Sequence, residues 1–350
     1  MIEPESCQRP RVAAAVETWR MFWFRLQPAY TLGLVRMAFG AVAIGWTVSL
    51  LPDLYALFGP HGVEPQQPED AYQWGVFAIW TSDHALLIGW ILLLVSSVAL
   101  TIGWHSRLAA LAVFVLILSF EHRDVWVFNS GDLAVRIEAL FLAISPCGAA
   151  LSLDQVRSTG KFWSAQQRPQ WPVRLMQLQL SLIYLASAQA KLNGNAWPQG
   201  TAVSYALRLP DMLLLPTPHW FTTSALLMNA VTWGTLAVEL SVGILVWNRR
   251  LRPWVLAAGV VMHTMIMITI AVGFFTLAVF VLYLAFIPPE IVERLPRSVK
   301  DMARKLVAAF PRGRPKSSKQ AENSDSTESE GVVAETRAES PIGARTTTED

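Results

Sequence analysis

Long apolar runs separated by polar connections dominate the first 290 residues of the chain. A helix needs about 20 predominantly apolar residues to cross the hydrocarbon core of a bilayer, and most of these runs approach that length. The pattern predicts an all-α polytopic membrane bundle of about eight transmembrane helices. The predicted spans are 31–51, 85–104, 108–120, 133–150, 173–192, 222–247, 254–271 and 274–287.

The third predicted span is short, and the polar segment EHRDVWVFNSGD follows it directly. Lipid cannot satisfy such groups, so we expect this segment to continue partly buried in protein. Gly273 marks the break between the last two spans, and the prolines of IPPE are expected to stop the final helix.

Composition divides the chain into four regions. Residues 1–28 form a basic segment, predicted to be amphipathic and to lie at a membrane interface because tryptophan and phenylalanine cluster in it. Residues 29–290 form the transmembrane domain, and 291–316 a basic juxtamembrane segment. Residues 317–350 are rich in Ser, Thr and Glu, contain almost no large apolar side chain, and are expected to be disordered.

Basic residues are distributed unevenly among the predicted connections. With the N-terminus in the cytoplasm, the inner segments before the tail contain twelve lysines and arginines, and the outer loops contain only Arg123 and Arg208. The positive-inside rule therefore predicts a multi-pass protein with both termini cytoplasmic, and we expect a bacterial inner membrane. If the third span is re-entrant, the orientation of everything after it is reversed.

Composition excludes several classes of function. Hydrophobic residues make up 53% of the 350 residues and charged residues 15%, whereas a soluble domain has about 25% charged residues. A net charge of +2 gives no basic field for nucleic acid. Cys7 and Cys147 lack CxxC partners, and no HExxH motif or Gly-rich phosphate loop is present, so no metal site is predicted. We identify no removable signal peptide.

One polar stripe runs along the helix predicted at 173–192. Its members, at helical spacing, are Gln177, Ser181, Tyr184, Ala188 and Lys191. Lipid cannot satisfy such a stripe, so it must face protein or a water-filled cavity. A lysine near a helix end often extends to the lipid headgroups, whereas a buried lysine can act as a base. The spacing alone leaves both roles open for Lys191.

Four other ionisable residues are candidates. Glu239 should be protonated or paired, and pairing with Lys191 or Arg136 would be structural, whereas pairing with His263 would suggest a proton relay. His263 is either a buried histidine bonded to a neighbouring helix or a functional group. Asp132 and Arg136 have the i, i+4 spacing of a helical ion pair. A structural role is favoured for this pair, although Arg136 can also hold an anionic group.

Three further features have structural interpretations. Arg36 is expected to be an anchor that extends to the headgroups at the inner end of the first span. His105 is expected to cap the tight turn in which it lies. Most of the fifteen tryptophans fall near predicted span ends, which is typical of the aromatic belts of membrane proteins.

Several short motifs occur in order between about residues 30 and 295. They are GWHSR at 103–107, NSGD at 129–132 with Arg136, SPCGAALSLD at 145–154, YLASAQAKLNGNAW at 184–197, the segment with Glu239, and MHTMIMITIAVGFF at 262–275 with IPPE. In these motifs the chain resembles the HTTM (horizontally transferred transmembrane domain) family, which is related to the membrane domain of vitamin K-dependent γ-carboxylase.

The resemblance implies a quinol-linked chemistry. In the carboxylase a lysine on the outer membrane side deprotonates reduced vitamin K, and the anion reacts with oxygen to give an epoxide and a strong base. Lys191 occupies the position of that lysine, and His263 matches a family histidine. The implied cofactors are reduced vitamin K or another quinol, with oxygen, and a quinone reductase is an implied partner. We expect Glu239, Arg136, Asp132 and Tyr184 to support the site.

Two departures from the carboxylase are visible. A second histidine after the third span is missing, where Ser130 or its neighbours stand, and a polar tail follows the last span where the carboxylase has a large extracytoplasmic domain. We therefore expect a quinol-linked oxygenase or another carboxylase-like reaction. The alternatives are a non-catalytic maturation or interaction factor for a secreted peptide and a transporter of a small apolar solute.

Overall fold

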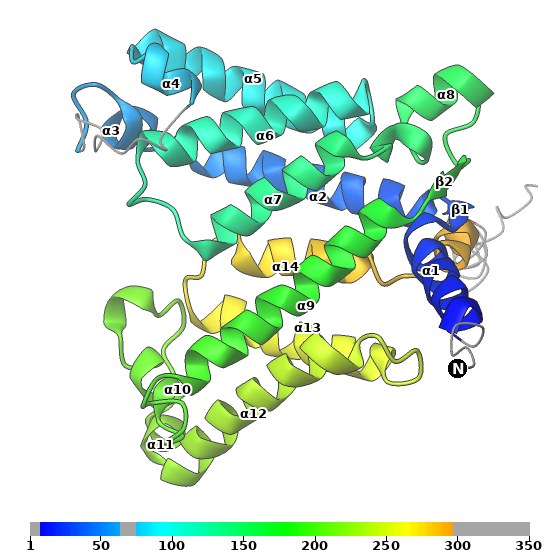
Figure 1. Ribbon diagram of the computed structural model, residues 1–350. Coiled ribbons are helices and arrows are strands. Elements are labelled where there is room, and N and C mark those ends of the chain that lie inside the picture. The colour runs from blue at the N-terminus through cyan, green and yellow to red at the C-terminus, as the bar shows by residue number, and fades with distance from the viewer. Residues whose placement is uncertain (1–7, 64–74, 297–350) are drawn as a thin grey trace, which may run out of the picture. The chain divides into compact units, whose positions relative to one another are not determined.

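A computed structural model describes residues 8–63 and 75–296, with side chains from residue 12 onward. The described chain is mostly helical, and a helix lies at each predicted span (Figure 1). These helices are α2 (Tyr30–Ser49), α5 (Asp83–Ile102), α6 (Ser106–Arg123), α7 (Ser130–Ile144), α9 (Trp171–Leu192), α12 (Ala225–Leu245), α13 (Arg252–Thr269) and α14 (Phe275–Leu284).

Four of the helices, α2, α5, α12 and α13, are long and apolar enough to cross a membrane. A fifth span results if α14 is combined with the helix Pro289–Pro296, from which it is bent by 94°. The helix ends at Leu284, and the break at residues 285–288 includes the first proline of IPPE, so the last span stops beside this motif, as predicted. With 10 residues, α14 is about 15 Å long, half the thickness of the hydrocarbon core. The fold class is confirmed as helical and of membrane type, while the count of eight stays a prediction.

Shorter elements connect these helices. They are α1 (Gln8–Phe24), α3 (Leu54–Phe58), α4 (Val76–Ile79), the 3-10 helices η1 (Cys147–Ala149) and η2 (Pro210–Met212), α8 (Leu153–Thr159), α10 (Ala202–Ala206) and α11 (His219–Thr223). An antiparallel pair, β1 (Leu26–Pro28) with β2 (Gln167–Pro169), is a small departure from the all-α prediction. The predicted tail, most of the juxtamembrane segment and Cys7 lie outside the described residues.

The long helices form two groups on either side of α14. In one group α2 packs on α5, α5 on α6 and α6 on α7, and in the other α12 packs on both α9 and α13. Between them α14 contacts α2, α7, α9 and α13, as Figure 1 shows. Because eight of the ten residues of α14 are Phe, Leu, Ala or Val, burial at this central place suits the helix. Phe39, Leu93 and Leu282 are among the fully buried core side chains.

One end of the bundle gathers the connections that the topology prediction places in the cytoplasm. The hydroxyl of Thr31 donates to the carbonyl oxygen of Ile287 at 2.8 Å, which joins the start of α2 to the end of α14. The amide of Ala29, just before α2, donates to Gln166 O at 3.1 Å. This bond joins the start of α2 to the loop before β2.

The other end gathers the connections predicted to lie outside. The guanidinium of Arg123, at the end of α6, donates to Gly59 O at 3.3 Å. The amide of Leu214, in the long loop after α9, donates to Thr269 O at 3.0 Å, beside the break at Gly273. The long helices therefore run back and forth between two ends that differ in their connections.

The polar segment after the third predicted span is partly buried, as expected: its first residues are buried, whereas Trp126 and Val127 are exposed. Glu121, Arg123 and Asp124 are each less than 7% exposed, although they stand at the end of α6. Protein groups, not water or lipid, therefore surround these charges.

The GWHSR and SPCGAALSLD motifs meet at the start of α6. The carboxylate of Asp154 accepts hydrogen bonds from the amides of His105 and Ser106, both at 2.8 Å, and from the Ser106 hydroxyl at 2.7 Å. Partial burial opposes ionisation, but these donors outweigh it and lower the pKa of Asp154. The side chain of His105 makes no cap, so Asp154 from α8 supplies the cap predicted for His105.

Arg36 is fully buried, and the prediction that it extends to the headgroups is wrong. Its guanidinium donates to the carbonyl oxygens of Leu100, Thr101 and Leu151, the contact to Thr101 being 2.8 Å. The first two carbonyls lie in the last turn of α5, where helix geometry leaves carbonyl groups short of partners. The Leu100 carbonyl also accepts the Gly103 amide at 3.1 Å. A guanidinium with five donors satisfies these groups from inside the protein.

Candidate functional site

The polar stripe of α9 faces protein, as the sequence predicts. The side-chain amide of Gln177 donates to Ala285 O at 2.7 Å, beyond the end of α14. The Trp247 indole donates to the Ser181 hydroxyl at 2.9 Å. Gln177, Ser181 and Tyr184 are each less than 8% exposed. Gln177 and Ser181 therefore connect α9 to residues that follow α12 and α14. Tyr184 and Lys191, later in the stripe, contact α14 and α12 directly.

Lys191, at the far end of the stripe, forms an ion pair with Glu239 of α12. The ammonium lies 2.5 Å from Glu239 Oε1 and donates to the Ser187 hydroxyl at 2.6 Å. It also lies 5.0 Å above the ring of Trp197, which the NGNAW turn brings back over the helix end. The side chains of Lys191 and Glu239 are 20% and 8% exposed, so the pair is largely removed from solvent.

Of the pairings considered for Glu239, the one with Lys191 is formed. Its second oxygen, Oε2, is buried and has no hydrogen-bond partner among the described residues. A buried carboxylate oxygen without a donor is costly. The pair therefore has one acceptor position that protein leaves open.

A second polar cluster lies nearer the middle of α9. The hydroxyl of Tyr184 is 2.7 Å from His263 Nε2 of α13, and it also hydrogen-bonds the hydroxyl of Tyr283 of α14. The His263 ring packs against the rings of Phe275 and Phe280. His263 Nδ1 is buried and has no partner within the described part of the chain. The histidine is bonded to a neighbouring helix, and one of its nitrogens is left open.

The two clusters share one face of α9. Tyr184 and Lys191 are seven residues apart, which places them about 10 Å apart along the helix axis. Gly243, one turn after Glu239, lies against the same helix: a Cβ there would lie 3.1 Å from the Leu185 side chain and 3.5 Å from the Tyr184 Cβ. A small residue at this position lets α9 and α12 approach closely.

The predicted ion pair between Asp132 and Arg136 is not formed. The carboxylate of Asp132 accepts the amide of Asn129 at 2.7 Å and the indole of Trp46 at 2.8 Å. Asp132 is the third residue of a capping box at the start of α7, and this role turns it away from the next helical turn. Arg136 instead lies 2.6 Å from Glu121 of α6. Neither residue contacts the Lys191 pair.

Sequence reasoning missed several members of these clusters. Tyr283 and Ser187 resemble ordinary residues of apolar helices, and only the packing shows that they bind Tyr184 and Lys191. Glu138 of α7 is 1% exposed, and neither of its carboxylate oxygens has a partner among the described residues. An acidic residue inside an apolar run was the available signal for Glu138.

Two glycines give a matched test of the second cluster. A Cβ on Gly259 of α13 would lie 2.1 Å from the Tyr283 hydroxyl, whereas a Cβ on Gly234 of α12 would meet nothing within 4 Å. We expect Gly259→Ala to destabilise the protein by about 1–3 kcal/mol through overpacking. We expect Gly234→Ala to stabilise it by up to about 1 kcal/mol through helix propensity. Thermal unfolding of both variants in detergent checks this, and equal shifts would contradict the packing at Tyr283.

Comparison with known proteins gives one result. The HTTM domain family matches residues 24–290 of the chain. No curated protein and no solved structure matches the chain significantly. Among the described residues, no group of three His, Cys, Asp or Glu side chains is placed to hold a metal ion. The matched range contains every residue of the two clusters on α9.

Proposed function

Because the chain belongs to the HTTM family, we propose that it is a membrane enzyme, related to the membrane domain of vitamin K-dependent γ-carboxylase, that acts on a quinol and oxygen. The observation that carries this proposal is the Lys191–Glu239 ion pair, half enclosed at one end of the polar stripe. A largely buried amine beside a carboxylate is an arrangement suited to proton transfer.

In the proposed topology the chain crosses the membrane eight times, with both termini in the cytoplasm. The gathering of alternate connections at opposite ends of the bundle supports this arrangement. The arginine-rich connections before α2, before α9 and between α12 and α13 meet at one end, as the positive-inside rule expects for the cytoplasmic side. Lys191 then faces the outer side. The short helix α14 is surrounded by other helices in this topology, so it does not have to span the full lipid thickness.

Lys191 is the proposed base. It can take a proton only as the neutral amine, and Glu239 can produce that form by accepting the ammonium proton within the pair. The Glu239 Oε2 position, without a protein partner, is where a hydroxyl of the substrate can donate. The ring of Trp197 lies over the ammonium at the helix end. Tyr184 and His263 continue the polar face inward and can hold a second polar group of the substrate.

The residues present fit a quinol, because Glu239 Oε2 and His263 Nδ1 are two buried polar atoms that lack partners within the described residues. A quinol supplies the proton for Lys191 and the electrons for oxygen, and one quinol and one oxygen molecule balance as one quinone epoxide and one water. Reduced vitamin K and related quinols are the proposed substrates, and a quinone reductase is the partner that regenerates them. Arg136 and Asp132 belong to the support of α6 and α7 in this proposal.

An oxygen-uptake and epoxide assay tests the proposal. Purified protein in lipid is supplied with reduced vitamin K or related quinols, and Lys191→Ala and Lys191→Arg are compared with wild type. Arginine keeps a positive charge beside Glu239 but is not a base at neutral pH. We expect both variants to lose activity about a hundredfold or more, the usual effect of removing a general base.

The variant Lys191→Arg also addresses the competing function. The same ion pair is also compatible with a non-catalytic function, since a pair that neutralises Lys191 can join α9 to α12 without any chemistry. A folded wild-type protein with no turnover on any quinol would indicate a maturation or interaction factor for a secreted peptide, or a solute transporter. Activity retained in Lys191→Arg would show that Lys191 is not the base.

A further inference from the structure

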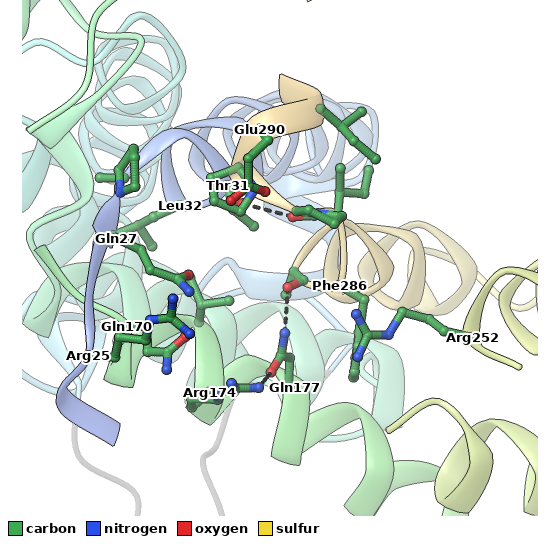
Figure 2. Close-up of a pocket in the computed structure, with 18 of the residues that line it drawn as sticks. Arg25, Gln27, Thr31, Leu32, Gln170, Arg174, Gln177, Arg252, Phe286 and Glu290 are labelled. Atoms are coloured by element: carbon green, nitrogen blue, oxygen red, sulfur yellow. Dashed lines mark hydrogen bonds between the residues drawn. The ribbon is translucent and has the colours of Figure 1, made fainter. Parts of the chain in front are cut away.

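A cavity of about 830 Å³ opens at the end of the bundle where α9 and α13 begin (Figure 2). Its walls come from the end of α1, from β1 and β2, from the turn between α12 and α13, and from the segment after α14. Lys191 and His263 do not line it. Arg174 lies on the same helix as Lys191 but seventeen residues before it, which is about 25 Å along the axis.

The cavity is strongly basic. Its lining contains five arginines and one acidic residue, Glu290; the arginines are Arg25, Arg168, Arg174, Arg249 and Arg252. The ion pairs within the described residues involve none of these five arginines. We call the five the arginine cluster. Five like charges gathered at one cavity with a single acidic residue repel one another unless an anion is bound.

Two members of the cluster are held in place by groups that do not neutralise them. Arg174 donates to Gln177 Oε1 at 2.8 Å and to Phe22 O at 3.3 Å. Arg252 donates to Val246 O at 2.9 Å and lies over the Phe286 ring. Figure 2 shows Arg25, Arg174 and Arg252 around the cavity, each from a different segment. The positively polarised N-termini of α9 and α13 face the same end.

We propose that the arginine cluster binds a phosphate-bearing anion, and that in the membrane this anion is the headgroup of an anionic phospholipid. Guanidinium groups bind phosphate oxygens through paired charge-assisted hydrogen bonds. The apolar side chains of Phe24 and Leu26, which flank the lining residue Arg25 in the chain, are exposed. They provide a surface for acyl chains next to the charge. This site is separate from the quinol site and does not depend on it.

Lipid binding to the full-length protein, measured by native mass spectrometry from neutral detergent, tests the proposal. Phosphatidylglycerol is compared with phosphatidylcholine, and inorganic phosphate in a parallel titration represents a soluble source. The variant Arg25→Gln/Arg249→Gln removes two exposed lining charges. Its control, Arg20→Gln/Lys161→Gln, removes two charges of the same predicted membrane side that do not line the cavity. We expect the first variant to bind phosphatidylglycerol at least about tenfold more weakly and the control to resemble wild type.

A second variant keeps the test decisive if the double variant does not fold. Glu290→Gln removes the acidic residue of the cavity, and we expect it to tighten phosphatidylglycerol binding by about threefold. Phosphate binding that depends on the cluster, without lipid selectivity, would assign the site to a soluble phosphate. Equal weakening by both double variants, or no response to Glu290→Gln, would overturn the proposal.

Discussion

Lys191→Met is expected to lower the free energy of unfolding by about 3–5 kcal/mol, because it leaves the Glu239 carboxylate buried without its counter-charge. The ammonium of Lys191 is the only cation that the described residues place in an ion pair with Glu239. The double variant Lys191→Met/Glu239→Leu removes both charges and fills the space with apolar groups of similar size. We expect it to recover most of the loss, since apolar replacements of buried ion pairs are often neutral or stabilising.

Thermal and chemical unfolding of Lys191→Met, Glu239→Leu and the double variant gives the coupling energy between Lys191 and Glu239. The matched control is Lys161→Met, which removes an exposed lysine in the loop before β2 and should change stability by less than about 0.5 kcal/mol. Additive effects of the two single changes would contradict the ion pair. The same variants distinguish a structural from a catalytic role of the pair. A double variant that is as stable as wild type but inactive would indicate a catalytic role.

Arg36→Met should cost about 3 kcal/mol or more of unfolding free energy. The change removes the donor shared by the carbonyl groups of Leu100, Thr101 and Leu151. The Leu100 carbonyl still accepts the Gly103 amide at 3.1 Å, so the cost comes mainly from the other two. A hydrogen bond to a charged group contributes about 1.5–3 kcal/mol, and buried acceptors left unpaired add a desolvation cost. Methionine occupies similar space, so lost packing explains little of the effect.

Unfolding of Arg36→Met in detergent, compared with Arg20→Met, measures this effect. The Arg20 side chain is 74% exposed and forms only a long contact of 4.0 Å to Glu17, so its loss should change stability by less than about 0.5 kcal/mol. A stability of Arg36→Met equal to that of wild type would show that the carbonyls of Thr101 and Leu151 find other donors.

The positions of the long helices follow from the sequence, because each apolar run contains more apolar side chains than a solvent-exposed loop would carry. The break at Gly273 and the stop at IPPE were likewise predictable, since both residue types interrupt helices for local reasons. The apolar runs do not reveal which helix is central. The buried place of α14 depends on its contacts with four other helices, which no local pattern encodes.

The candidate site was predictable in part. The stripe on α9 follows from helical spacing, and Glu239 is expected from the sequence to be protonated or paired, with Lys191 among the candidate partners. Spacing alone was misleading for Asp132 and Arg136, because Asn129 is the N-cap of α7 and Asp132 forms a capping box with it. Tyr283 and Ser187 could not be predicted, since a hydroxyl in an apolar helix gives no sign of its partner.

The partners of Arg36 also determine when this end of the bundle can be completed during synthesis. Leu100 and Thr101 follow Arg36 by 64 and 65 residues, and Leu151 follows it by 115 residues. Until these segments leave the ribosome, the newly made first helix carries an unshielded cation that lipid excludes. The helix therefore has to keep Arg36 at a hydrated boundary and can settle to its final depth only after residue 151 has been made.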